Sequence, residues 1–247
     1  MEEAFKIQAL KLLRKLRDIF LGIARLDREA FASVYLKGSG IEIGALWDPL
    51  KVPRSTKVQY VDHMTIPDLR RHYPELKNRK LVNVDILDDG ETLGTIADAS
   101  QYFVIANHFL EHCEDPIRAM INFTRVLRDS GILFLTVPDK RFTFDKYRQI
   151  TPFDHFVIDY ANGPVFSRNE HFRDWVVNVE GQKDEAIIQQ RVNELVSTSY
   201  SIHFHCWTQE EMFEFFSKLN EQYNLHLEIQ LFMKHDGEAI FIIKKYI

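Results

Sequence analysis

The 247-residue sequence predicts a single α/β domain, residues 1–247, built on a mostly parallel sheet. Between residues 40 and 138, apolar runs of strand length alternate with polar or helical segments, which is typical of βαβ units. Residues 225–247 instead alternate apolar and polar side chains on both sides of Asp236-Gly237, a dipeptide that favours a tight hairpin turn. We therefore expect a set of parallel strands that is closed by an antiparallel hairpin.

The periodicity of apolar residues places the individual elements. A helix after residue 107 is expected to begin at Asp115, which can cap it, with Pro116 in its first turn. Thr208 and Glu211 form a capping box at the start of the helix that leads into the hairpin. Strands of the parallel part are expected at 40–44, 57–62, 81–85, 102–107 and 131–137.

Two further segments are predicted to be helical. Residues 1–36 form an N-terminal helical segment, in which residues 5–26 carry apolar side chains at helical spacing opposite Lys and Arg. We expect this helix to pack over a substrate site or against a partner subunit, as in a homodimer, in preference to a membrane surface. Residues 140–205 are rich in aromatics and histidines without strand alternation, and are interpreted as a helical lid inserted after the fifth strand.

Composition excludes several classes of function. The formal net charge of -5 argues against a nucleic-acid binder, which would display a basic face. No apolar run approaches the ~18 residues of a membrane span. The cysteines Cys113 and Cys206 make no disulfide framework and sit in apolar stretches, so they are expected to be buried thiols of a cytoplasmic protein.

Acidic residues follow the expected strands where a ligand of a doubly wound sheet would lie. Asp62 comes about 20 residues after the turn at Gly44, a spacing that suits a grip on ribose hydroxyls. Asp85 is placed to accept from an adenine amine, and Glu42 to fix the turn or to hold a cationic part of the ligand. A single glycine with several acids suits a ligand without a pyrophosphate, such as S-adenosylmethionine. The alternative is that these acids are solvated strand ends.

The stretch "YFVIANHFLEHCEDPIRAMINFTRVLRDSGILFLTVPD", residues 102–139, resembles the class I S-adenosylmethionine-dependent methyltransferases, particularly their small-molecule branch. The resemblance extends over residues 38–138 and, more loosely, over the closing helix and hairpin. It implies a Rossmann-like, seven-stranded sheet of order 3-2-1-4-5-7-6 with the last strand antiparallel and helices on both faces. It also implies that S-adenosylmethionine is the cofactor.

The resemblance carries cofactor-binding roles to particular positions of this chain. Asp62 is implied to bind ribose, and Asp85 with Ile86 to border adenine. Asn107 and His108 are implied to lie beside the sulfonium.

The glycine turn departs from the usual pattern of the family. Gly44, which the resemblance brings close to the methionine part of the cofactor, is followed by Ala45 and Leu46 where a second glycine is usual. Leu46 or the next residue, Trp47, is therefore expected to pack against the ligand.

The catalytic group is sought among residues of the lid and its flanks, because methyl transfer to a hydroxyl needs a base of near-neutral pKa. The candidates are His155, His171, His203, His205 and Asp139. His203 and His205 would share one face of an extended strand, which also permits a metal site, but no cluster of acids accompanies them. We therefore expect no metal and keep a hydrogen-bonded structural pair as the alternative. For Asp139 the alternative is a solvated turn.

Glu111 and His112 in the Leu-Glu-His element are interpreted as residues that orient their own loop.

Taken together, these patterns predict a methyltransferase acting on oxygen of a small-molecule or glycan-like acceptor. A non-catalytic or repurposed binding protein on the same fold is the alternative. Nicotinamide-dependent redox chemistry is disfavoured, since the glycine fingerprint is missing and the sheet ends antiparallel.

Overall fold

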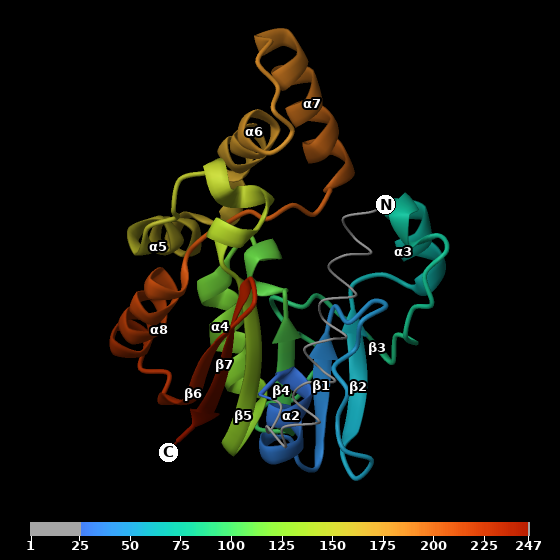
Figure 1. The fold of residues 1–247 in the computed structure, drawn as a ribbon, viewed down its shortest axis with the longest axis vertical. Helices are drawn as coiled ribbons and strands as arrows, with labels where there is room; N and C mark the ends of the chain where they lie inside the picture. The colour runs from blue at the N-terminus through green and yellow to red at the C-terminus, as the bar shows by residue number, and fades with distance from the viewer. Residues whose placement is uncertain (1–25, 247) are drawn as a thin grey trace, which may run out of the picture.

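A computed structural model describes residues 26–246 of the chain. Its centre is a seven-stranded sheet of order β3-β2-β1-β4-β5-β7-β6 (Figure 1). Of these seven strands, β7 alone runs in the direction opposite to the other six. This order and the antiparallel last strand confirm the prediction. The strands are β1 (Ser39–Ile43), β2 (Lys57–Asp62), β3 (Ile86–Leu87), β4 (Gln101–Asn107), β5 (Leu127–Pro138), β6 (Leu227–His235) and β7 (Glu238–Lys245).

The third strand was predicted at the wrong position. It comprises only Ile86–Leu87, whereas residues 81–85 form no strand. The reason is a side chain, because Asp85 Oδ2 accepts from the backbone N–H of Tyr60 at 3.0 Å. The backbone N–H of Tyr60 thus donates to a side-chain carboxylate instead of to a backbone carbonyl oxygen of a neighbouring strand.

The fifth strand begins earlier than expected, at Leu127, and contains an irregularity. The register against β4 shifts between Gln101 and Phe103, and Ser130 has a φ of +62°. A bulge before Gly131 therefore separates the first residues of β5 from the regular ladder.

The helices confirm the expected caps. The Asp115 side chain accepts from Arg118 N at the start of α4, and the capping box of Thr208 and Glu211 opens α8. The helices are α2 (Arg28–Tyr35), α3 (Ile66–His72), α4 (Pro116–Val126), α5 (Phe153–Asn162), α6 (Arg168–Asn178), α7 (Glu185–Thr198) and α8 (Gln209–Tyr223). Short 3-10 turns are η1 (Pro74–Leu76), η2 (Leu110–His112), η3 (Lys140–Phe142), η4 (Phe144–Tyr147) and η5 (Pro164–Phe166). All but the last residue of the predicted helix 5–26 lies outside the described residues.

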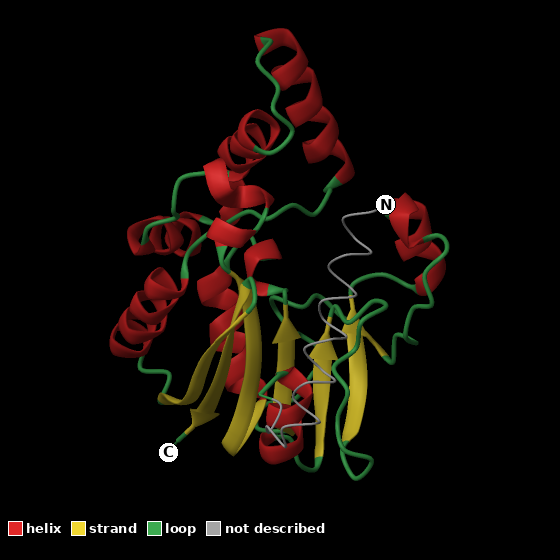
Figure 2. Ribbon diagram, in the orientation of Figure 1, coloured by secondary structure: helices red, strands yellow, loops and turns green. Residues whose placement is uncertain are grey.

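Two hydrophobic cores cover the two faces of the sheet, with helices on both sides (Figure 2). Val104 and Ala106 of β4 point into the core under α4 and α8, and Phe103 and Ile105 point into the core under α2. This alternation is what a strand with two buried faces requires. No helix within residues 26–246 is long and apolar enough to cross a membrane.

The segment 140–205 contributes three α-helices, α5, α6 and α7, above the carboxyl ends of the parallel strands (Figure 1). A third, small core packs α6 and α7 against the chain that returns to the sheet. Its buried members are Phe172, Val176, Ile188, Val192, Leu195, Ile202 and Phe204. The helical content agrees with the predicted lid, and the role of this segment as a lid stays a prediction.

Candidate active site

Three adjoining cavities lie at the carboxyl ends of β1, β2 and β4. The central cavity, of about 280 Å³, is lined by residues that include Gly44, Asp62, Gly90 and Phe109. The glycine-side cavity, also about 280 Å³, shares the turn after β1 and His108 with it. The lid-side cavity, about 410 Å³, shares Gly90 and Phe109 with the central one. Together they form a cleft that leads from the glycine turn to the helical segment 140–205.

Most of the predicted cofactor residues line this cleft. Those in contact with the central or glycine-side cavity are Glu42, Gly44, Ala45, Leu46, Asp62, Asn107 and His108. Asp85 and Ile86 line none of the three cavities, and the Asp85 carboxylate is held by the backbone of β2. The adenine-bordering role of these two residues therefore stays a prediction.

The modified glycine turn is shaped by a buried carboxylate. Gly44 and Leu46 have φ values of +64° and +48°, so the chain turns sharply after β1. Glu42 Oε1 accepts from the backbone N–H of Leu50 at 2.9 Å and closes the loop. Burial raises the pKa of Glu42 to about 7, and the hydrogen bond from Leu50 only partly opposes this shift.

Unpaired polar atoms lie beside the glycine-side cavity. Glu42 Oε2 and both polar atoms of the Asn107 amide are buried and have no hydrogen-bond partner within residues 26–246. Buried polar groups normally find partners, so these atoms are available to a ligand. The Glu42 carboxylate can accept from an ammonium group, and the Asn107 amide can both donate and accept. This combination fits the amino-acid group of the methionine part of S-adenosylmethionine.

Asp62 lies at the end of β2 and faces the central cavity. It is 9% exposed, and its Oδ1 accepts from Met64 N at 3.1 Å. The local hydrogen bond fixes the carboxylate so that it is pre-oriented for a ligand hydroxyl. This position fits the predicted contact with ribose.

His108 follows β4 with a φ of +49° and lies between two carboxylates. Its Nε2 is 2.6 Å from Glu238 Oε2, and its Nδ1 is 3.3 Å from Glu111 Oε1. Burial alone would lower the pKa of His108, but the hydrogen bonds with Glu111 and Glu238 raise it to about 10. A protonated imidazole thus sits beside two acids, and Arg28 Nε, 3.4 Å from Glu238 Oε1, completes the ion-pair group.

The residue that sequence reasoning missed is His112 of η2, which lines all three cavities. Its Nδ1 is 2.9 Å from the carbonyl oxygen of Ile202 and 3.0 Å from Ser201 Oγ. Because a carbonyl only accepts, Nδ1 carries the proton and Nε2 has the free lone pair. Burial lowers the pKa of His112 to about 4, so the ring is neutral near pH 7 and is a weaker base than the near-neutral one expected from the sequence.

Within the described residues, none of the five predicted catalytic candidates lines any of the three cavities. These candidates are His155, His171, His203, His205 and Asp139. Asp139 is 2% exposed, caps η3 and binds Arg141 through both of its oxygens, so it does not lie in a solvated turn. His203 is held by Asp145 at 2.7 Å and packs its ring edge-on against His112, with centroids 4.7 Å apart. His155, His171 and His205 lie together in a separate cluster.

The lid-side cavity is polar and is bounded by ion pairs. Arg168 of α6 donates from Nε and Nη2 to Glu114 Oε2, at 3.0 and 2.7 Å. Arg118 Nε donates to Asp115 Oδ2 at 3.0 Å on the same wall. These groups can hydrogen-bond a polar ligand that enters next to His112.

The sheet order and the acid-lined cleft are those of the class I S-adenosylmethionine-dependent methyltransferase fold. Residues 39–135, which supply most of the lining of the cleft, match a sequence family described as "Methyltransferase domain". This part of the chain is therefore a methyltransferase domain, and its cofactor is S-adenosylmethionine.

The chain is similar to several solved structures at low sequence identity. A putative Zn-dependent alcohol dehydrogenase from Rhodobacter sphaeroides is 12% identical with a TM-score of 0.50, over 86% of this chain and 85% of that one. A S-adenosylmethionine-dependent methyltransferase from Methanosarcina mazei is 14% identical with a TM-score of 0.44, over 86% and 94%. A possible histamine N-methyltransferase from Thermotoga maritima is 16% identical with a TM-score of 0.43, over 85% and 82%. No curated protein sequence matches the chain.

Proposed function

We propose that this methyltransferase methylates a hydroxyl oxygen of a small, polar, glycan-like acceptor in the lid-side cavity. The observation that carries the proposal is the neutral imidazole of His112, which borders the cofactor side and the lid side of the cleft. A hydroxyl must lose its proton when it is methylated, and a positioned imidazole is a common base for that purpose.

The cofactor is expected in the central and glycine-side cavities. Glu42 and Asn107 would bind the amino-acid part, and Asp62 the ribose hydroxyls. When bound, S-adenosylmethionine supplies a methyl group that is open to attack by a nucleophile. The chain itself aligns the two ligands, excludes water and takes up a proton at His112 Nε2.

The character of the lid-side cavity supports a polar acceptor. Its wall offers the carboxylates of Glu114 and Asp115, the guanidinium of Arg168 and the hydroxyl of Ser201. Several charged and hydroxyl groups around one space suit a ligand with several hydroxyls, since each buried hydroxyl needs a partner.

A screen with S-adenosylmethionine labelled in its methyl group tests this proposal. Sugars, phenols and amines are offered in parallel, and mass spectrometry of the product locates the label. We expect transfer to an oxygen of a hydroxyl-bearing acceptor. Transfer to amines alone would contradict the proposal.

The setting of the reaction is also proposed. The thiols of Cys113 and Cys206 are buried and free, which is consistent with the reducing cytoplasm. The formal net charge of -5 favours a small acceptor over nucleic acid. Sedimentation of the full chain would test the predicted homodimer.

A further inference from the structure

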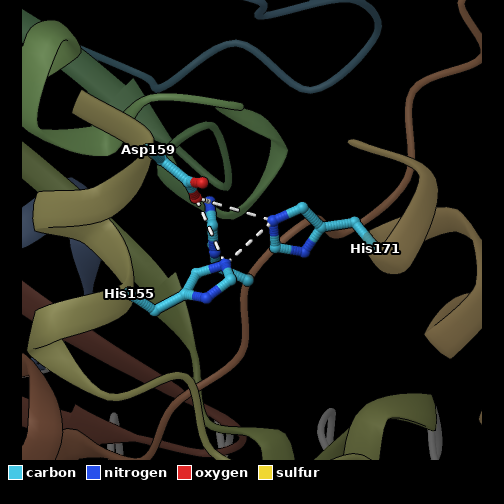
Figure 3. A group of neighbouring side chains, drawn as sticks. His155, Asp159 and His171 are labelled. Carbon is cyan, nitrogen blue, oxygen red and sulfur yellow. Dashed lines mark hydrogen bonds and ion pairs between the residues drawn. The ribbon is translucent and has the colours of Figure 1, made fainter. Parts of the chain in front are cut away.

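Four potential metal ligands converge within the segment 140–205 and its return to the sheet. His155 and Asp159 stand one turn apart on α5, His171 comes from α6, and His205 from the extended chain that follows α7. Figure 3 shows His155, Asp159 and His171 pointing toward one another from the two helices. One ligand atom from each of the four residues lies within 4.8 Å of the others.

Four of the six distances between these atoms lie near the edge length of a tetrahedron around a small cation, and all six are within 4.8 Å. His155 Nε2 is 3.1 Å from His171 Nε2 and 3.3 Å from Asp159 Oδ2. Asp159 Oδ2 is 3.6 Å from His171 Nε2 and 3.8 Å from His205 Nε2. Ligands about 2.0–2.1 Å from a tetrahedral zinc ion are about 3.3–3.4 Å from one another, so the observed edges lie around this value.

The carboxylate at the centre of the cluster is buried among three imidazoles. Asp159 and His205 are 0% exposed, and Asp159 Oδ2 faces His155, His171 and His205 without a contact among the described residues that meets hydrogen-bond geometry. A metal ion between these groups would give the buried oxygen a closer partner. The other oxygen, Oδ1, accepts from the hydroxyl of Ser167, which orients the carboxylate as outer-shell partners of metal ligands do.

We propose that His155, Asp159, His171 and His205 bind a zinc ion. Three imidazole nitrogens and one carboxylate oxygen are ligands that zinc accepts, and four protein ligands fill its tetrahedral positions. The site is therefore structural, because no position is left for water or substrate. The least buried ligand is His155, whose side chain is 27% exposed and gives the ion a route of entry.

The zinc ion would tie α6 and the returning chain, which share a small core with α7, to α5, whose Phe153 and Phe156 belong to the main core. The core between α6, α7 and the returning chain has seven buried apolar side chains, and a metal supplies the stability that such a small core lacks. The cluster also adjoins the wall of the lid-side cavity. Ser167, which donates to Asp159, directly precedes Arg168, whose guanidinium pairs with Glu114. Zinc would thus hold Arg168 and its pair with Glu114 in place.

Metal analysis of the full-length chain tests the proposal without reference to its activity. Protein produced with Zn²⁺ and dialysed against metal-free buffer is expected to hold one zinc ion per chain by plasma mass spectrometry. Replacement by Co²⁺ should give the intense visible absorption of a tetrahedral ion. His226→Asn, which changes an exposed histidine outside the cluster, should leave both results unchanged.

Variants locate the ion. Ser167→Ala is expected to lower zinc affinity roughly 10- to 100-fold, as the loss of an outer-shell partner does. His155→Ala should lower it further, and circular dichroism shows whether this variant, at the most exposed ligand, remains folded. A wild-type chain that takes up no zinc from an excess of Zn²⁺ would overturn the proposal. So would a zinc ion that persists in folded His155→Ala and His171→Ala, since it would lie elsewhere, for example at Glu111, His112 and His203.

Discussion

The Nε2 atom of His108 lies 2.6 Å from Oε2 of Glu238 and thereby joins the end of β4 to the start of β7. These two strands are not neighbours in the sheet, because β5 lies between them. The ion pair therefore spans the carboxyl end of β5 at the edge of the cofactor cleft. Arg28 Nε, 3.4 Å from Glu238 Oε1, extends it to α2.

This ion pair predicts a dependence of stability on pH. The pKa of His108 is raised from 6.5 to about 10, so its contribution to folding is full below pH 6.5 and is lost as the pH rises toward 10. The side chain is 42% exposed, and solvent screening reduces the expected contribution to about 1 kcal/mol. His108→Asn tolerates the positive φ and removes the charge. Urea unfolding should give a difference between wild type and variant that shrinks from pH 6.5 to 10. A constant difference would contradict this prediction.

Glu42 predicts opposite effects on stability and on binding. Its pKa is raised to about 7, so the charged carboxylate destabilises the fold progressively as the pH rises from 4.5 through 7. Glu42→Gln keeps an acceptor for Leu50 N and is expected to raise the free energy of unfolding by about 2 kcal/mol at pH 8. The same change should weaken S-adenosylmethionine binding about 10-fold or more, since a charged partner is lost. At pH 5 the two proteins should have nearly equal stability, and a variant with unchanged affinity would remove Glu42 from the binding site.

Asp62 and Asp85 form a matched pair, because both carboxylates follow expected strands but only Asp62 lines the cleft. Asp62→Ala is expected to weaken binding of S-adenosylmethionine by ~1–3 kcal/mol in calorimetry, while the domain stays folded. Asp85→Ala should mainly lower the melting temperature, because Tyr60 N loses its acceptor. Equal losses of affinity in both variants would place Asp85 in the site after all.

The separate strands and the closing hairpin could be predicted from sequence because they depend on local patterns, whereas the order of the strands in the sheet came from the resemblance to a known family. Alternation of apolar residues located β1, β2 and β4, and a dipeptide with a turn preference located the hairpin of β6 and β7. The third strand was misplaced because the carboxylate of Asp85 competes with a backbone carbonyl, an effect that propensity does not contain. Periodicity cannot detect this kind of side-chain substitution.

The histidines were harder to interpret, because their environment is created by distant parts of the chain. The sequence analysis found no acid beside His203 and His205. In the structure, Asp159 of α5, which comes 46 positions before His205 in the sequence, lies next to it. The pairing of His203 with Asp145 likewise joins residues 58 positions apart. His112 was interpreted as a loop residue because its burial and its bond to Ile202 O, 90 positions away, appear only in three dimensions.

The proposed role of His112 is tested by a substitution that separates its two ring nitrogens. In His112→Asn the side-chain amide can still donate to Ile202 O as Nδ1 does, while the acceptor at Nε2 is lost. We expect kcat to fall about 10²- to 10⁴-fold, as for the loss of a general base, with KM for S-adenosylmethionine changed little.

His226→Asn is the control, because it makes the same change at an exposed histidine that lines none of the three cavities. The pH profile gives a second measurement. Since burial lowers the pKa of His112 to about 4, the wild-type rate should be flat between pH 6 and 8 and decline only toward pH 4. A rate that instead titrates near 6.5 would assign the base to an imidazole in an ordinary environment, and a His112→Asn enzyme with wild-type kcat would exclude His112 altogether.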